Sequence, residues 1–284
     1  MSGPTTTTTT TTYAQAPLAR GALTLALHAW SCPEPHTVVF YIHGTQSHAG
    51  WMFETGPALA GLGCAVYALD RRGSGASEGA RGDAGSYHEW VDDYLAAMAL
   101  VRERHPGLPM LLNGQSFGGA IAAGVACDPR ASHDALLLCS PLIAARVGFD
   151  LWQGVADDVP VRIPAPDTWF TSDPRYLDFI ARDPLMVRAI TRRFHDARLR
   201  LGEHYLSQDA PLAGRPCALV IPRADPMVDL AGARDVFARL TGGGGMVIEL
   251  PGNDHYLEFS PGRPLLWRLQ ASFARAFAPP RGAS

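Results

Sequence analysis

Ser116 stands at the centre of residues 114–118, whose sequence Gly-Gln-Ser-Phe-Gly has the residue types and spacing of a nucleophile site. The pattern G-x-S-x-G is typical of a sharp turn between a strand and a helix, which holds the serine hydroxyl above the edge of a sheet. Glycines on both sides leave room for the strained backbone of such a turn. Backbone N–H groups at the start of the helix could stabilise an oxyanion there. The pattern favours nucleophilic attack on a carbonyl, and the alternative interpretation is a glycine-rich turn without chemistry.

A nucleophilic serine needs a base that accepts its proton and an acid that orients the base. Asp225 follows a predicted strand at residues 217–221, and His255 follows the next predicted strand, at residues 246–250. Because the carboxyl ends of parallel strands meet at one edge of a sheet, we expect Ser116, Asp225 and His255 to lie together. The order serine, acid, histidine along the chain is also the order found in α/β-hydrolases.

Other residues compete for these roles. Asp229 follows the same strand as Asp225, and Asp254 directly precedes the histidine, so either could be the orienting acid. Among the ten histidines, His43 ends a predicted strand and is expected to fix the loop after it rather than to act as a base. His43 and His48 alone do not make a metal-ligand set, so we interpret the pair as loop architecture and predict no metal site.

The apolar pattern alternates between strands and helices along the chain, which predicts a mostly parallel sheet. The longest predicted helix carries apolar side chains at helical spacing and stops at a Pro-Gly pair. The predicted strands lie at residues 21–30, 37–42, 64–69, 109–112, 135–139, 217–221 and 246–250. The predicted helices lie at residues 87–104, 119–126, 230–240 and 264–277.

The pattern changes between residues 141 and 215, a stretch rich in proline, arginine, aspartate and aromatic residues. A structureless loop of that length is uncommon in a compact domain. We therefore predict a helical cap over residues 141–215, inserted into a core formed by residues 19–140 and 216–284. Its aromatic residues are expected to form the core of the cap and part of a pocket wall.

Composition argues against several classes of function. The formal net charge of −3 gives no basic surface for nucleic acid and no polybasic segment for anionic lipid. The sequence has no lysine, so all 24 basic residues are arginine, which excludes Schiff-base chemistry, a Ser-Lys dyad and a P-loop lysine. We therefore expect a small-molecule partner and no nucleic acid.

The cysteines and the N-terminal sequence bear on the cellular location of the protein. The five cysteines include no C-x-x-C pair, so neither a disulfide framework nor a zinc site is predicted, and free thiols fit a cytoplasmic protein. Residues 5–12 are all threonine and lack the charged and apolar regions of a secretory signal, so we predict a disordered tail over residues 1–18. No stretch approaches the roughly 18 apolar residues of a transmembrane helix.

Three separated motifs resemble those of one family. Residues 43–50 (HGTQSHAG) resemble an HG-x-x-x-H-x-G oxyanion loop, residues 70–77 (DRRGSGAS) a D-x-R-G-x-G-x-S segment, and residues 114–119 (GQSFGG) the sequence G-H-S-M-G-G. Together they look like the monoacylglycerol lipase and lysophospholipase group of serine α/β-hydrolases, which is serine aminopeptidase S33-like. The resemblance covers residues 22–278 and includes Asp183-Pro184-Leu185, which is similar to a cap segment common in that group.

This resemblance implies an α/β-hydrolase fold: an eight-stranded, mostly parallel sheet with helices on both faces and a helical cap between the sixth and seventh strands. It also implies hydrolysis of acyl esters without a cofactor. By position, Ser116 matches the nucleophile of the family, Asp225 its acid and His255 its base. The implied oxyanion donors are the backbone N–H groups of Thr45 and Phe117.

Departures from the family pattern fall around the expected pocket. Gln115 and Phe117 replace the usual histidine and methionine beside the serine, and Thr45-Gln46 replaces smaller residues in the oxyanion loop. A more polar pocket mouth is therefore expected. The predicted substrate-binding residues are Gln46, Gln115, Trp152, Trp169 and Phe170.

The leading hypothesis is a serine hydrolase that cleaves acyl esters through an acyl-enzyme. Its substrates would be monoacylglycerol-like, lysophospholipid-like or other medium-to-long acyl esters. A thioesterase or acyltransferase acting on a biosynthetic intermediate is a second hypothesis, since an arginine-rich cap suits an acidic or carrier-bound substrate. A catalytically silent binding protein on the same fold is a third.

Overall fold

The computed structural model describes residues 11–146 and 150–277. Its centre is an eight-stranded sheet in the order β1-β2-β4-β3-β5-β6-β9-β10. β2 pairs antiparallel with β1 and with β4, and all the other pairs are parallel. The mostly parallel sheet is therefore confirmed. Its strands are β1 (Thr12–Arg20), β2 (Leu23–Ser31), β3 (Thr37–Ile42), β4 (Cys64–Leu69), β5 (Met110–Gln115), β6 (Ala135–Cys139), β9 (Cys217–Pro222) and β10 (Met246–Leu250).

The buried central strands lie where the apolar runs predict them. The first edge strand, β1, is not among the predicted strands. β3, β4 and β6 match their predicted ranges, because a parallel strand covered on both faces reads as a continuous apolar run. The predicted disordered tail is wrong for residues 12–18, which belong to β1 and pair along β2. β1 is an exposed edge strand of mixed polarity, so it carries little hydrophobic signal. Residues 1–10 lie outside the described residues.

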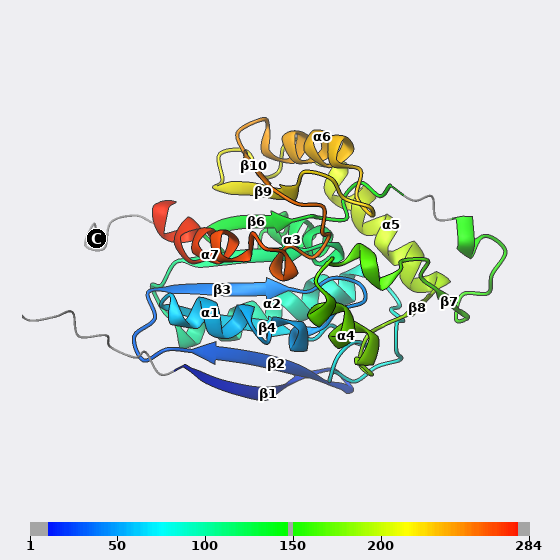
Figure 1. Cartoon of the computed structure of the whole chain (residues 1–284), viewed down its shortest axis with the longest axis horizontal. Helices are drawn as coiled ribbons and strands as arrows, with labels where there is room; N and C mark the ends of the chain where they lie inside the picture. The colour runs from blue at the N-terminus through cyan, green and yellow to red at the C-terminus, as the bar shows by residue number, and fades with distance from the viewer. Residues whose placement is uncertain (1–10, 147–149, 278–284) are drawn as a thin grey trace, which may run out of the picture.

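Helices cover both faces of the sheet (Figure 1). Along β3, Phe40 and Ile42 belong to the apolar cluster shared with α2 and α3, whereas Val39 and Tyr41 belong to the cluster shared with α1 and α7. This alternation is the two-residue repeat of a strand, and it buries both faces of β3. The helices of the core are α1 (Thr55–Gly61), α2 (Tyr87–Arg104), α3 (Phe117–Ala126), α6 (Leu230–Thr241) and α7 (Arg263–Phe277).

The chain between β6 and β9, which are the sixth and seventh strands of the sheet, contains helices and a short two-stranded ribbon. We call the described part of residues 141–215 the inserted segment. It lies beyond the arrowheads of β3 and β6, at the edge of the sheet where parallel strands end (Figure 1). The ribbon is antiparallel, so this segment is not wholly helical as predicted. Its elements are η2 (Asp150–Trp152), β7 (Pro160–Arg162), η3 (Asp167–Trp169), α4 (Pro174–Arg182), β8 (Ala189–Thr191) and α5 (Arg192–Leu206).

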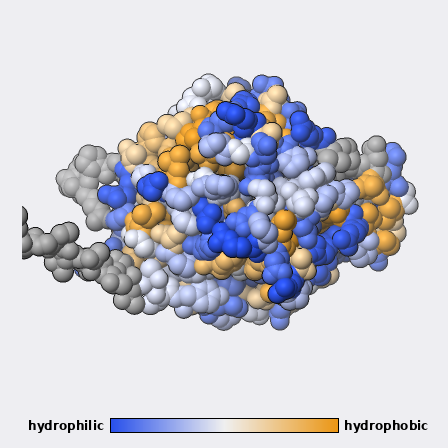
Figure 2. All heavy atoms as spheres, viewed as in Figure 1, coloured by the Kyte–Doolittle hydropathy of each residue, from blue (hydrophilic) through white to orange (hydrophobic). Residues whose placement is uncertain are grey.

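The surface is largely hydrophilic on the face shown in Figure 2. An apolar area lies over the β10 edge, where Met246 and Val247 are exposed. Among the described helices, none combines the length and apolar character that would let it cross a membrane.

Asp70, directly after β4, hydrogen-bonds to three separate segments of the chain near the carboxyl edge of the sheet. Its carboxylate accepts hydrogen bonds from the amides of Ala49 and Ala76, both at 2.7 Å, and from Nε2 of His28 at 3.1 Å. Burial alone would raise the pKa of Asp70, but the hydrogen bond from His28 and the fields of His43 and His28 outweigh burial and lower that pKa to about 2. The charged carboxylate therefore stabilises the fold.

Asp70→Asn is expected to lower the free energy of unfolding near neutral pH and to flatten its dependence on acid pH. The folded pKa of Asp70 lies below its ordinary value of 3.8, so its contribution is complete above about pH 4 and is lost as the pH falls toward 2. A shift of this size corresponds to a few kcal/mol, on the order of 2. Urea titrations over this range measure it, with Asp178→Asn, an exposed carboxylate of α4, as control. Equal slopes for the wild-type chain and Asp70→Asn would contradict the assignment.

Candidate active site

Ser116 lies between β5 and α3 with the strained backbone that the motif predicts. Its φ of 55° and ψ of −124° fall in a region that non-glycine residues rarely occupy, at a cost of about 1–3 kcal/mol. The flanking glycines allow a close approach: a Cβ on Gly118 would lie 2.1 Å from the carbonyl oxygen of Ile42, and one on Gly114 would lie 2.4 Å from the carbonyl oxygen of Gly118. The surrounding packing therefore holds the serine in place.

The structure brings Ser116, His255 and Asp225 into one hydrogen-bonded chain. Nε2 of His255 lies 2.8 Å from Oγ of Ser116, and Nδ1 of His255 lies 2.8 Å from Oδ2 of Asp225. A carboxylate accepts only, so Nδ1 carries the proton and Nε2 is left to accept the serine hydroxyl proton. All three side chains are buried, which shields the chain from competing water.

Asp225 is held in its charged form by the turn that follows β9. Its Oδ1 accepts from the amides of Met227 at 2.8 Å and Val228 at 3.0 Å, while Oδ2 faces His255. Burial would raise the pKa of Asp225, but the charge and hydrogen bond of His255 and the two amides outweigh burial, so that pKa lies below its ordinary value. The carboxylate is thus ready to stabilise an imidazolium.

The two competing acids have other partners. Asp229 caps the N-terminus of α6, accepting from the amide of Ala231 at 3.2 Å. Asp254 accepts from Oγ of Ser172 at 3.4 Å, and burial raises its pKa. Neither has a hydrogen bond to His255 within the described residues, so the geometry favours Asp225.

His43 and Arg71 both bind the carbonyl oxygen of Gly44. Nδ1 of His43 donates to it at 2.9 Å, and Nη1 of Arg71 donates at 3.1 Å. In a trans peptide the N–H points away from the carbonyl, so the amide of Thr45 is turned away from His43 and Arg71. Thr45 itself lines a cavity together with Ser116. The loop role predicted for His43 agrees with these contacts.

Phe117 supplies the second implied oxyanion donor. As the first residue of α3, its amide has no acceptor within the helix, and the helix dipole favours negative charge there. Thr45 and Phe117 stay the predicted oxyanion donors: Phe117 directly follows Ser116, and Thr45 lines the same cavity as the serine.

Arg71 is a fully buried cation that sequence reasoning missed. Besides Gly44, it binds the carbonyl oxygen of Thr45 through Nη2 at 2.9 Å, and its guanidinium lies 5.5 Å from the ring centre of Phe117 and 5.4 Å from that of Phe194. Burial lowers the pKa of Arg71 to about 10, so it stays charged at neutral pH. The one available signal was its place in the motif at residues 70–77.

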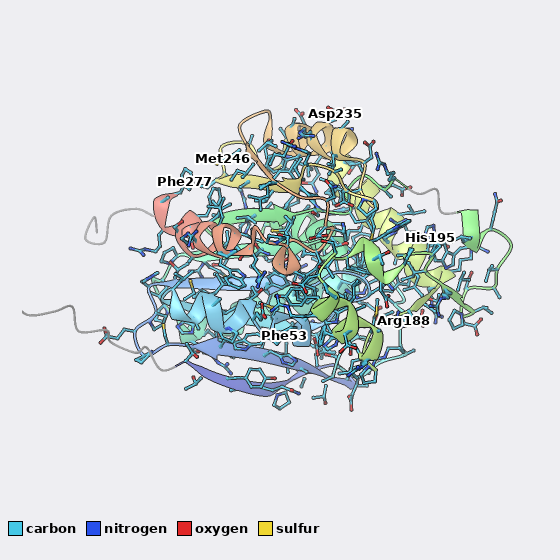
Figure 3. The ribbon with its side chains drawn as sticks, viewed as in Figure 1. Phe53, Arg188, His195, Asp235, Met246 and Phe277 are labelled. Atoms are coloured by element: carbon cyan, nitrogen blue, oxygen red, sulfur yellow. The ribbon has the colours of Figure 1, made fainter. Side chains whose placement is uncertain are left out.

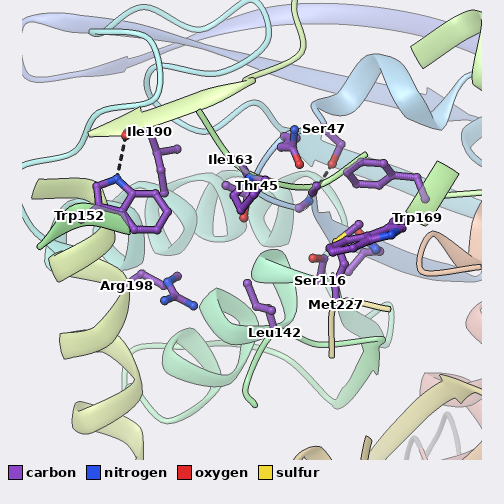
Figure 4. Close-up of a pocket in the computed structure, with 16 residues that line it drawn as sticks. Thr45, Ser47, Ser116, Leu142, Trp152, Ile163, Trp169, Ile190, Arg198 and Met227 are labelled. Atoms are coloured by element: carbon purple, nitrogen blue, oxygen red, sulfur yellow. Dashed lines mark hydrogen bonds between the residues drawn. The ribbon is translucent and has the colours of Figure 1, made fainter. Parts of the chain in front are cut away.

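An apolar cavity opens beside Ser116 (Figure 4). It encloses about 70 Å³, small beside typical ligand pockets of about 300–1,000 Å³, so a substrate must be slender there or the inserted segment must shift. All five predicted substrate-binding residues line it. The lining residues are Gly44, Thr45, Gln46, Ser47, Gln115, Ser116, Leu142, Trp152, Ile163, Pro164, Ala165, Trp169, Phe170, Ile190, Arg198 and Met227.

The inserted segment is bonded to the loops that carry the site. The amide of His255 donates to the carbonyl of Trp169 at 3.1 Å, and the amide of Val187 donates to the carbonyl of Gln46 at 3.0 Å. Asp183, from the Asp-Pro-Leu sequence noted above, accepts from Nε2 of His48 at 3.0 Å and from Nε1 of Trp51 at 2.7 Å. A shift of the inserted segment would therefore disturb the histidine and the oxyanion loop.

The site is built from hydrogen-bonding and apolar groups. Within residues 11–146 and 150–277, no three His, Cys, Asp or Glu side chains cluster in a way that could hold a metal ion. The arrangement of Ser116, His255 and Asp225 can perform nucleophilic acyl chemistry.

Comparison with known families gives a match over most of the chain. The family described as serine aminopeptidase, S33 (Hydrolase_4) matches residues 33–261. The resemblance drawn from the three motifs is thereby confirmed.

This chain is similar to two lipases over different shares of its length. Human monoglyceride lipase is 37% identical over 111 residues, which are 39% of this chain and 37% of the human protein. The monoacylglycerol lipase of Mycolicibacterium smegmatis is 26% identical over 224 residues, or 75% of this chain and 79% of that protein. The first match thus spans little more than a third of the human relative.

Solved structures share the fold at lower identity. A soluble variant of the monoglyceride lipase from Saccharomyces cerevisiae, in complex with a substrate analogue, superposes with a TM-score of 0.79 at 18% identity, covering 93% of this chain and 95% of that one. The monoacylglycerol lipase of Paleococcus ferrophilus gives a TM-score of 0.77 at 19% identity, covering 89% and 99%. These likenesses confirm the predicted α/β-hydrolase fold.

Asp225→Asn is expected to slow the reaction of Ser116 with a fluorophosphonate probe by several orders of magnitude. Replacing the acid of a Ser-His-Asp triad by its amide favours the wrong histidine tautomer and costs about 10⁴ in kcat in a serine protease. The rate of labelling, followed by mass spectrometry, measures the effect. Asp229→Asn serves as the matched control and should label within about threefold of wild type. If Asp229→Asn were the slow variant, the acid would be misassigned.

Arg71→Lys is expected to slow the same reaction by about 10- to 100-fold while the chain remains folded. A lysine keeps the charge but loses the fork that binds two carbonyl oxygens, so the Thr45 amide is held less firmly, and loss of one oxyanion donor costs about 10²–10³. Arg72→Lys, at the neighbouring residue that pairs with Asp93 and Glu89, is the control. Unchanged labelling of a folded Arg71→Lys protein would show that Arg71 does not position the loop.

Proposed function

We infer that this chain, which belongs to the serine aminopeptidase S33 (Hydrolase_4) family of α/β-hydrolases, hydrolyses carboxylic acyl esters with Ser116 as nucleophile. One observation carries the proposal: Ser116 is hydrogen-bonded through His255 to Asp225 and also lines an apolar cavity. Nucleophile, base and orienting acid are the parts that acyl transfer through a serine requires.

The first half of the proposed reaction forms an acyl-enzyme. Nε2 of His255 takes the proton of the Ser116 hydroxyl as Oγ attacks the ester carbonyl carbon. The carbonyl oxygen becomes an oxyanion that the amides of Thr45 and Phe117 stabilise. When the tetrahedral intermediate collapses, the bond to the alcohol oxygen breaks, and His255 returns its proton to the leaving alcohol.

The second half releases the acid. Water gives a proton to His255 and attacks the acyl carbon, a second oxyanion forms between the same amides, and Oγ of Ser116 leaves and regains the proton. Throughout, Asp225 keeps Nδ1 of His255 protonated and stabilises the imidazolium form.

The substrates proposed are esters with an apolar acyl chain, of the monoacylglycerol or lysophospholipid kind. The apolar lining by Leu142, Ile163 and Phe170 supports an apolar chain next to Ser116. The names of the human and mycobacterial relatives support the same class, since both are lipases of monoacylglycerols.

Ser116→Ala is expected to abolish hydrolysis of p-nitrophenyl esters, with a loss of kcat on the order of 10⁶, as when the nucleophile of a serine protease is removed. Assays with p-nitrophenyl esters of graded chain length, 1-monoacylglycerol and an acyl-thioester measure turnover and chain preference. Ser272→Ala, an exposed serine of α7, is the matched control and should retain wild-type rates.

Equal activity in the wild-type and Ser116→Ala proteins would reject the proposal. Turnover of the thioester with no turnover of oxygen esters would move the reaction to the thioesterase class. Labelling of Ser116 by a fluorophosphonate without turnover of any ester would favour transfer to an acceptor other than water.

A further inference from the structure

The cavity beside Ser116 is also lined by a positively charged side chain, that of Arg198. Arg198 extends into it from α5, on the side of Trp152, while Ser116 lies on the side of Trp169 and Met227 (Figure 4). Among the described residues that line the cavity, Arg198 is the one with a charged side chain. The cavity therefore combines a reactive serine, apolar walls and one positive charge.

Arg198 is oriented by neighbouring side chains. Its Nη2 donates to Nδ1 of His195 at 3.4 Å, and the ring of His195, labelled in Figure 3, stacks on Trp152 with centroids 4.4 Å apart and planes 8° apart. Trp152 is fixed in turn by a hydrogen bond from Nε1 to the carbonyl of Ile190 at 3.2 Å. A guanidinium has five N–H donors, so Arg198 can keep protein partners and still bind a ligand.

Arg198 remains charged where it lies. Burial lowers its pKa to about 10, which leaves the guanidinium protonated at neutral pH. A partly desolvated guanidinium forms stronger hydrogen bonds to an anion than one in bulk water, and its fork fits a carboxylate or a phosphate. Arg198 would therefore favour a negatively charged substrate over a neutral one, which apolar walls alone cannot do.

We propose that Arg198 binds an anionic group of the substrate, a carboxylate or a phosphate, while the ester carbonyl lies at Ser116. This inference rests on the proposed ester hydrolysis and narrows its substrate class to acyl esters that carry one negative charge. The charge could sit on the acyl part, as in a half-ester of a dicarboxylic acid, or on the alcohol part, as in an acylglycerol phosphate. Both sources present the same chemistry to Arg198.

Two matched substrate pairs test the inference. The first pair is p-nitrophenyl hexanoate and p-nitrophenyl monoadipate, and the second is a 1-monoacylglycerol and the 1-acylglycerol 3-phosphate of equal chain length. Arg198→Gln is expected to lower kcat/KM about 10- to 100-fold for the anionic member of one pair and to leave the neutral member within about threefold. The affected pair tells which part of the substrate carries the charge. Arg198→Lys should recover part of the loss.

Arg200→Gln is the control, because Arg200 lies on the same helix and is exposed. Thermal denaturation checks that each variant folds, and if Arg198→Gln does not fold, Arg198→Lys decides the question with a smaller expected loss of the same selectivity. Equal effects on the neutral and anionic members of both pairs, or no effect on either, would overturn the inference.

A binding measurement tests the anion site independently of the proposed ester hydrolysis. Calorimetry with monomethyl adipate on Ser116→Ala, and on the same protein with Arg198→Gln added, requires no turnover. Binding that is lost with Arg198→Gln, together with a wild-type protein that turns over no ester, would reject the hydrolase and keep the anion site. Turnover that depends on Ser116 with no preference linked to Arg198 would keep the hydrolase and reject the anion site.

Discussion

The carbonyl oxygen of Gly44 is the point on which the site depends. His43 and Arg71 both donate to it, and these two hydrogen bonds fix the peptide plane that includes the Thr45 amide. Nε2 of His43 accepts from the amide of Arg71 at 3.0 Å, so the histidine is neutral here, and burial lowers its pKa to about 3. Two buried groups from different strand ends thus fix one peptide plane, which is the preorganisation that oxyanion stabilisation needs.

The strained backbone of Ser116 is held in place by the strands and hydrogen bonds around it. β5 is buried on both faces, and its neighbours β3 and β6 pair with it along their lengths. The amide of Ser116 bonds the carbonyl of Cys139, and its carbonyl accepts from the amide of Leu142 at 2.8 Å. These contacts over-determine the turn and hold the serine in its strained geometry. Trp169 of the inserted segment lines the cavity beside the serine, and its carbonyl accepts from the amide of His255.

Much of the fold follows from the sequence, because central parallel strands are long apolar runs and their ends must meet at one edge. That rule was enough to predict that Asp225 and His255 approach Ser116, although 30 or more residues separate each from the others. The rule fails at the edge strand β1 and in the inserted segment. β1 gains its structure from pairing with β2 rather than from its own composition, and the β7–β8 ribbon is too short to leave a periodic signal.

Arg71 and Arg198 show why the rest of the site could not be predicted. Arg198 lies on a helix with Arg192, Arg193 and Arg200, and local sequence does not distinguish the one that faces the cavity from those that face solvent. Arg71 likewise stands beside Arg72, which pairs with the carboxylates of Asp93 and Glu89 instead of backbone carbonyls. The function of a cation depends on what it contacts after folding: Arg71 meets backbone carbonyls and shapes the oxyanion loop, whereas Arg198 faces the space a substrate would fill. The sequence therefore shows that a residue is charged, whereas its role follows from its contacts in the folded chain.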